Sequence, residues 1–183
     1  MFTDGTITRW RDDAITVLDA ASEGPQVLVG SSMGGWLMLL VALARPERVA
    51  GLVGIAAAPD FTEDLMWLAF DSSARTLLET EGVYLEPSPY DPEPTPITMG
   101  LIEDGRQHLV LGQTIPFSGP VRLIHGMGDQ DVPWQYSVRT AEALTSPDVA
   151  LTLIKGGDHR LSEPHQIEQI IAAVADVCAR IAY

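Results

Sequence analysis

Three polar positions, each just after a β-type run, have the residue types that nucleophilic catalysis requires. Ser32 lies in a Gly-x-Ser-x-Gly-Gly run, an acidic loop contains Asp129 and Asp131, and His159 follows two glycines. A serine hydroxyl becomes a good nucleophile when a histidine takes its proton, and a carboxylate keeps that imidazole in the right tautomer. Because the loops after parallel strands gather at one end of a sheet, these residues can meet in space. The pattern predicts a Ser-His-Asp triad with Ser32 as nucleophile and His159 as base.

The serine stands in a strand-turn-helix context. The apolar run 25–29 precedes it, and the helix-forming stretch Met33–Ala44 follows at once. This arrangement is typical of a nucleophile elbow, in which the serine sits on a sharp turn. We expect Gly30 and Gly34 to relieve crowding around the strained serine. The backbone N–H of Met33 is the expected first donor of an oxyanion hole. The alternative is a glycine-rich loop at an ordinary strand-helix corner.

The elements that must position these residues alternate between strand and helix patterns. Alternating β and α segments with buried strands predict an α/β fold, with a mostly parallel sheet flanked by helices on both faces. The chain has 183 residues, 46% of them hydrophobic, which is enough for one sizeable core and a single domain over residues 1–183. The expected strands are 25–29, 49–56, 121–126 and 149–154, and the expected helices are 6–21, 33–44 and 164–181.

One segment, about 60–118, breaks the alternation. It contains a short helical patch over Leu65–Leu78 and then the proline-rich run Glu86–Pro96. We interpret the segment as a cap-like insertion that would shape a pocket over the site. For the prolines we expect an extended surface loop.

Composition excludes several classes of function. The net charge of −14 argues against a nucleic-acid or anionic-membrane partner, which would call for a basic patch. No stretch is long and apolar enough to span a membrane, no secretory signal is evident, and a cytoplasmic protein is predicted. No metal-ligand spacing or nucleotide-binding loop occurs, so neither metal nor cofactor is expected. The single cysteine, Cys178, is expected to be a small buried hydrophobe on the last helix.

The segments GPQVLVGSSMGGWLMLLVALARPERVAGLVGIAAAPDFTE, VRLIHGMGDQDVPWQYS and GGDHRLSE resemble the α/β-hydrolase fold superfamily. More narrowly, the chain is similar over nearly its whole length to bacterial relatives of the mitochondrial α/β-hydrolase-domain palmitoyl-protein thioesterases. This resemblance implies a nucleophile at Ser32, an acid at Asp129 and a base at His159. It also implies cleavage of acyl thioesters and activated esters, including acyl glucuronides.

The resemblance also bears on the residues that compete for two of these roles. The pattern His-Gly-x-x-Asp-x-x-Val-Pro is common in the superfamily and favours Asp129, which leaves Asp131 as a loop-capping or solvated carboxylate. His125 precedes a glycine at a strand end, where a structural role is expected. The two remaining histidines lie in polar or helical surroundings: His108 and His165.

The chain departs from the superfamily upstream of Ser32. The elbow comes after a single predicted helix, whereas the superfamily has several strands there and takes its second oxyanion-hole donor from one of their loops. Loss of one such donor costs about 2.7–4 kcal/mol of transition-state stabilisation. The strand before Ser32 would then lie at a sheet edge, where it could pair with a second copy. We therefore interpret the chain as an N-terminally shortened hydrolase and expect a homodimer as one way to cover the edge.

The expected reaction is hydrolysis of a small-molecule acyl ester or thioester through an acyl-enzyme on Ser32. One rival is a peptidase, because Val132–Ser137 (VPWQYS) is similar to the prolyl oligopeptidase catalytic domain. A second rival is a folded but catalytically impaired fragment of a longer hydrolase. Transfer of the acyl group to an alcohol or amine is a third alternative, since such acceptors compete with water.

Overall fold

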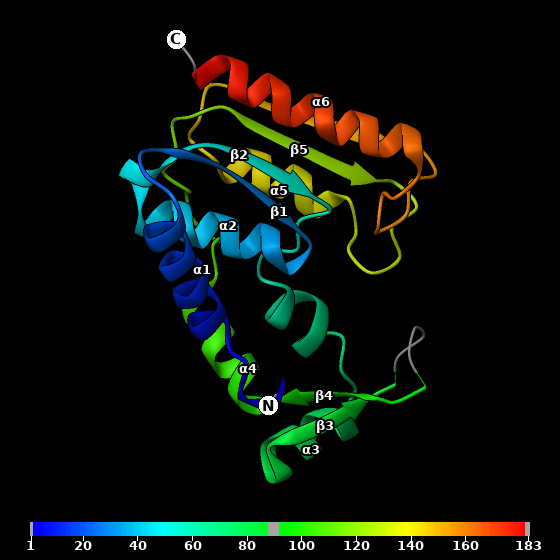
Figure 1. The fold of residues 1–183 in the computed structure, drawn as a ribbon. Coiled ribbons are helices and arrows are strands. Elements are labelled where there is room, and N and C mark those ends of the chain that lie inside the picture. The colour runs from blue at the N-terminus through cyan, green and yellow to red at the C-terminus, as the bar shows by residue number, and fades with distance from the viewer. Residues whose placement is uncertain (1, 88–91, 182–183) are drawn as a thin grey trace. The chain divides into compact units, whose positions relative to one another are not determined.

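Four parallel strands form the main sheet (Figure 1). In this sheet, each strand runs parallel to its neighbours. The computed structural model describes residues 2–87 and 92–181, and in this part of the chain it confirms the predicted α/β fold. The strands, in their spatial order, are β1 (Gln26–Ser31), β2 (Val49–Ile55), β5 (Val121–Gly126) and β6 (Val149–Ile154).

The chain folds into two units. The sheet unit comprises residues 13–59 and 110–183, and the small unit comprises residues 1–12 and 60–109. Helix α1 (Ile7–Ala21) begins in the small unit and continues into the sheet unit. It starts after Thr6, whose hydroxyl accepts a hydrogen bond from the backbone N–H of Arg9, as expected of an N-cap.

Helices cover both faces of the sheet, as predicted. Helix α6 (Pro164–Ile181) lies on one face, and α2 (Met33–Ala44) and α5 (Gln135–Ala143) lie on the other (Figure 1). The nearly all-apolar α2 is largely buried, and a 3₁₀ turn over Pro46–Arg48 leads from it to β2. Helix α5 was not among the expected elements.

The sheet is unevenly buried. All six residues of β5 are buried, and so are most of β2. Strand β1 pairs with β2 alone among the described strands, and its Val29 is 50% exposed. The strand that leads to Ser32 therefore lies at an edge of the sheet, as predicted.

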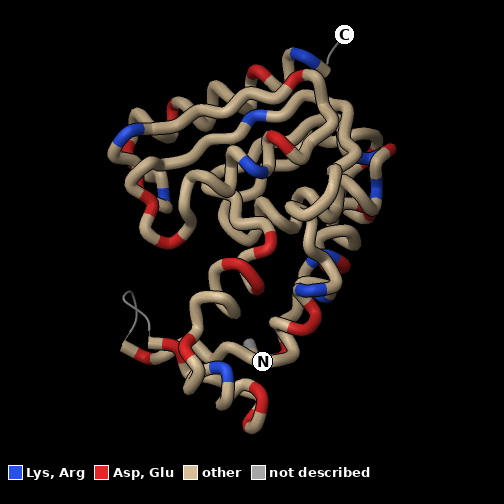
Figure 2. The backbone as a smooth tube through the Cα atoms, turned by 180° about the vertical axis from the view of Figure 1, so that it is seen from behind, with Lys and Arg blue, Asp and Glu red and all other residues tan. Residues whose placement is uncertain are grey.

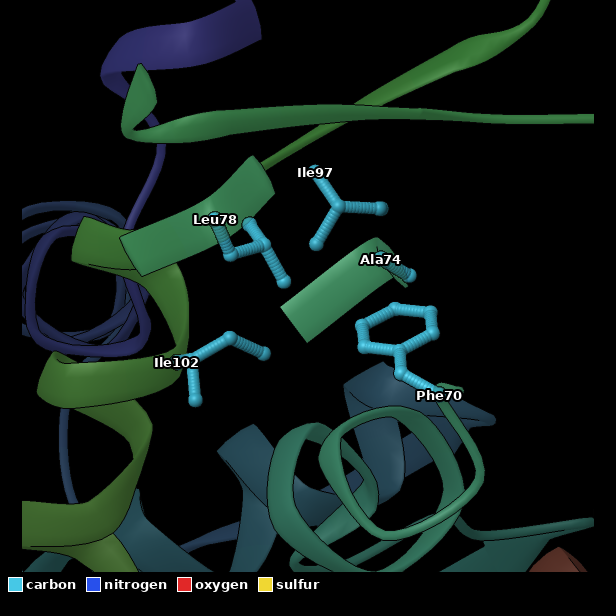
Figure 3. Close-up of a cluster of buried hydrophobic side chains, with 5 residues drawn as sticks. All are labelled: Phe70, Ala74, Leu78, Ile97 and Ile102. Atoms are coloured by element: carbon cyan, nitrogen blue, oxygen red, sulfur yellow. The ribbon is translucent and has the colours of Figure 1, made fainter. Parts of the chain in front are cut away.

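The small unit has its own hydrophobic core, formed by Phe70, Ala74, Leu78, Ile97 and Ile102 (Figure 3). Phe70 lies in a bend between two helices, and the other four residues lie on helices or on a two-stranded antiparallel ribbon. The elements of this unit are a 3₁₀ turn (Phe2–Asp4), a π-helix (Thr62–Trp67), α3 (Ser72–Glu81), β3 (Val83–Glu86), β4 (Thr95–Thr98), α4 (Met99–Gly105) and a second 3₁₀ turn (Arg106–His108).

Two expectations for this unit need correction. The patch Leu65–Leu78 is not one helix, because the π-helix ends at Trp67 and a separate helix, α3, begins at Ser72. Asp71 caps α3 by accepting a hydrogen bond from Ala74 N at 2.8 Å. The proline-rich run is not a loop at its ends, because Glu86 closes β3 and Thr95 begins β4. Proline is tolerated there because both strands of a two-stranded ribbon are edges. Residues 88–91 of the run lie outside the described residues.

A third correction concerns α6. Cys178 is exposed rather than buried, while its neighbour Val177 is fully buried. Successive residues on a helix point about 100° apart, so only one of the two faces the sheet. Ile167 and Ile171 on the same helix are also exposed, at 44% and 62%.

Charge is spread over the chain rather than gathered. Figure 2 shows acidic residues on both units, in line with the net charge of −14. Among the described helices, none has both the length and the hydropathy that crossing a membrane demands.

Candidate active site

Ser32 occupies the turn between β1 and α2. Its backbone has φ 53° and ψ −124°, an unusual conformation for a residue other than glycine. Two hydrogen bonds of 3.0 Å hold this turn against the end of β2, since Ser32 N donates to Ile55 O and Ala58 N donates to Ser32 O. Strain of this kind costs about 1–3 kcal/mol and persists only where the surroundings impose it. Ser32 is partly exposed, which the predicted role of nucleophile requires.

The glycines around Ser32 differ in what they do. A Cβ on Gly30 would overlap the carbonyl of Gly34, so this position requires glycine, as predicted. A Cβ on Gly34 would meet open space, and the expectation that its small size relieves crowding is wrong. The second tight position is Gly35, where a Cβ would overlap Ala57. The elbow thus needs glycine at Gly30 and Gly35.

Asp129 lies in the loop after β5, and its side chain is fully buried. Its Oδ1 accepts hydrogen bonds from the backbone N–H groups of Asp131 at 2.9 Å and Val132 at 2.8 Å. Its Oδ2 lies 2.7 Å from Nδ1 of His159 and 3.1 Å from Nε2 of His125. The carboxylate that contacts His159 is therefore that of Asp129, whereas Asp131 is exposed and contributes its backbone N–H.

His159 lies between Ser32 and Asp129. Its Nδ1 faces the carboxylate at 2.7 Å, and its Nε2 is 3.0 Å from Oγ of Ser32. Because an ionised carboxylate only accepts hydrogen bonds, Nδ1 carries the proton and the neutral ring offers its Nε2 lone pair to the serine hydroxyl. The structure thus brings the three predicted residues into one hydrogen-bonded chain.

A local turn holds His159 in place. Oδ1 of Asp158 accepts hydrogen bonds from the backbone N–H groups of Arg160 at 3.1 Å and Leu161 at 2.9 Å. Leu161 adopts a positive φ of 47° and is buried. His159 therefore lies in a turn that the Asp158 side chain closes by hydrogen bonds, and the buried side chain of Leu161 anchors this turn to the core.

The loops that carry Asp129 and His159 pack directly on each other. Gly128 N donates to Gly157 O at 2.9 Å. A Cβ on Gly126 would overlap the carbonyl of Gly157, so the close approach requires glycine at this position. Sequence reasoning assigned no role to Gly126, although its place at the end of a buried strand was a usable signal.

The remaining predicted residues are placed as follows. Met33 begins α2, so its N–H belongs to the first turn, whose donors have no partner within the helix. His125 is fully buried and contacts Asp129. His108 lies in the small unit, with Nε2 2.6 Å from Oγ1 of Thr8. His165 is exposed on α6.

One group of side chains in the described residues has atoms close enough for a metal ion. Ligand-type atoms of Asp129, Asp131 and His159 lie within 4.8 Å of one another. However, the Asp129 carboxylate already faces four N–H donors, which matches its full capacity as an acceptor. The 2.7 Å contact between Asp129 and His159 accounts for the closeness of these two groups.

Comparison with known proteins gives consistent similarities. The profile of the alpha/beta hydrolase fold family matches residues 2–82. The mouse mitochondrial palmitoyl-protein thioesterase ABHD10 is 42% identical over 177 residues, which cover 96% of this chain and 59% of that protein. The human protein of the same name is 37% identical over 179 residues, covering 97% and 58%. This chain therefore spans less than two thirds of these relatives' length.

Two solved structures are similar over nearly the whole chain. A crystal structure of a protein from Agrobacterium vitis S4 has a TM-score of 0.92 and 42% identity, covering 96% of this chain and 70% of that one. The structure of mouse α/β-hydrolase domain-containing protein 10 has a TM-score of 0.87 and 41% identity, covering 97% and 71%.

Proposed function

Because this chain belongs to the α/β-hydrolase fold family, we propose that it is a serine hydrolase of carboxylic esters or acyl thioesters. In this proposal Ser32 is the nucleophile, His159 the general base and Asp129 the acid. The observation that carries it is the unbroken contact from Asp129 Oδ2 through the His159 ring to Ser32 Oγ, at 2.7 and 3.0 Å.

The tautomer of His159 determines the first step. Its Nε2 accepts the hydroxyl proton of Ser32 while Oγ forms a bond to the acyl carbonyl carbon. The ring becomes an imidazolium, which the fully buried Asp129 carboxylate stabilises through Nδ1–H. The carbonyl oxygen gains negative charge and takes a hydrogen bond from Met33 N–H, at the positive end of α2.

The second half of the reaction returns the proton. The tetrahedral species collapses, the bond to the leaving alcohol or thiol breaks, and His159 gives that group its proton. The acyl group then remains on Ser32 Oγ. A water molecule loses a proton to His159 Nε2 and attacks the acyl carbon, and Ser32 leaves with that proton, releasing the carboxylic acid.

Thioesters are the substrates we favour, since the mouse and human relatives are named palmitoyl-protein thioesterases. The test is hydrolysis of S-acyl thioesters and p-nitrophenyl esters of graded acyl length by the purified chain. Turnover with a maximum at one range of acyl lengths is the expected result. Cleavage of a proline-containing peptide amide would instead indicate a peptidase, and a folded chain without turnover would indicate an impaired hydrolase.

Three further predictions extend this proposal. Residues 60–118 act as a cap-like insertion within one domain, a second copy covers the exposed edge of β1, and the protein is cytoplasmic. The mouse and human relatives are named mitochondrial, so localisation needs its own measurement.

A further inference from the structure

A second histidine approaches the Asp129 carboxylate. The ring of His125 is fully buried at the end of β5, with Nε2 3.1 Å from Asp129 Oδ2 and 2.9 Å from the carbonyl oxygen of Val132. Its Nδ1 lies 2.7 Å from Oγ of Ser137 on α5. Sequence reasoning gave His125 a structural role and did not single out Ser137.

The partners determine the tautomer of His125. Both groups at Nε2 are acceptors, so this nitrogen carries the proton. Nδ1 of the neutral ring then accepts, and the buried hydroxyl of Ser137 donates to it. Every polar atom of the neutral ring is satisfied, and burial lowers the pKa of His125 from its ordinary value, so the ring stays neutral near pH 7.

His125 and His159 therefore donate to the same oxygen of Asp129. A carboxylate that accepts more hydrogen bonds has its charge better stabilised and attracts a neighbouring imidazolium less strongly. The second donor also fixes the plane of the carboxylate, which fixes the ring of His159 against Ser32.

Resting on the proposed function, we propose that His125, held in its Nε2–H tautomer by Ser137, is a positioning residue of the catalytic site. It orients Asp129 and limits the proton affinity of His159. Asp129 and Asp131 face His159, with a carboxylate oxygen of each within 4.8 Å of a ring nitrogen. His125 acts on His159 through Asp129 and also interacts with it electrostatically.

The test compares His125→Leu, which removes the donor, with His125→Gln, whose amide nitrogen can take the place of Nε2–H. In His125→Leu we expect kcat to fall by about tenfold or more at unchanged KM. The acid limb of the kcat/KM profile should move to higher pH by about 0.5–1 unit, the equivalent of one net hydrogen bond. His125→Gln should restore both. An unmoved limb in His125→Leu, or a Gln variant no better than Leu, would overturn the proposal.

Two further measurements keep the test decisive if His125→Leu does not fold or the chain does not turn over. Ser137→Ala should move the acid limb of the kcat/KM profile to higher pH as well, by a smaller amount than His125→Leu. The ¹⁵N NMR spectrum of the Ser32→Ala chain, which needs no activity, should show His125 as the Nε2–H tautomer; an Nδ1–H tautomer would overturn the proposal. A folded wild type that neither hydrolyses esters or thioesters nor reacts with a fluorophosphonate probe would count against the proposed function instead.

Discussion

Asp129 Oδ2 and His159 Nδ1 lie 2.7 Å apart, although 30 residues separate them in the sequence. The contact joins the loop after β5 to the loop after β6, and the strands β5 and β6 are direct neighbours in the sheet. Because Asp129 is fully buried and its other oxygen is held by two backbone N–H groups, the carboxylate has one orientation. This orientation fixes the proton of His159 on Nδ1 and leaves Nε2 for Ser32.

A change at Asp129 tests this assignment against its neighbour. Asp129→Asn places an amide beside Nδ1 of His159 and favours the wrong tautomer, so kcat should fall by about 10⁴-fold. Asp131→Asn keeps the backbone N–H that holds Asp129, so kcat should stay within about threefold of the wild type. Steady-state kinetics with a p-nitrophenyl ester measures both. A larger loss in Asp131→Asn than in Asp129→Asn would reverse the assignment.

The two glycines around the serine give a matched pair for stability. Gly30→Ala forces a Cβ onto the Gly34 carbonyl and should lower the free energy of unfolding by about 1–3 kcal/mol. Gly34→Ala points into open space on a helix and should change it by less than about 1 kcal/mol. Urea unfolding followed by tryptophan fluorescence distinguishes them. Equal losses in the two variants would mean that Gly34 is also crowded.

Burial of His125 predicts how stability depends on pH. Burial lowers its pKa below the ordinary value of 6.5, and burial also lowers that of His108. Just below pH 6.5 the unfolded chain therefore binds more protons than the folded one, and the free energy of unfolding falls as the pH falls. The free energy of unfolding stops falling from this cause once the pH is below the pKa values that the two histidines have in the folded chain.

The variant His125→Gln isolates the share of His125. Its free energy of unfolding should fall less steeply than that of the wild type between about pH 7 and pH 5.5, with His108 still contributing. Urea denaturation at each pH provides the comparison. Identical slopes for the two proteins would show that His125 is not held neutral by burial.

Much of the fold and the site could be predicted because the signals are local. The apolar run before Ser32, the glycines beside it and the order of Ser32, Asp129 and His159 all follow from short segments. The contacts that the sequence did not reveal depend on tertiary packing. Nothing in the segment Gln135–Ala143 indicated that its Ser137 would reach His125, because that contact requires α5 to pack beside β5.

Other differences have equally specific causes. Gly34 and Gly35 are adjacent, and only the position of Ala57 decides which of them is crowded. The prolines suggested a loop, yet Leu85 and Pro96 pair in a two-stranded ribbon that tolerates proline.

The most direct test of the central claim is covalent labelling of the purified chain by a fluorophosphonate probe. The wild type should be labelled at Ser32, Ser32→Ala should not be labelled, and Ser31→Ala, which alters the exposed neighbouring serine, should be labelled like the wild type. The three proteins should unfold at similar urea concentrations. Labelling that survives in Ser32→Ala, or a folded wild type that is never labelled, would contradict the account.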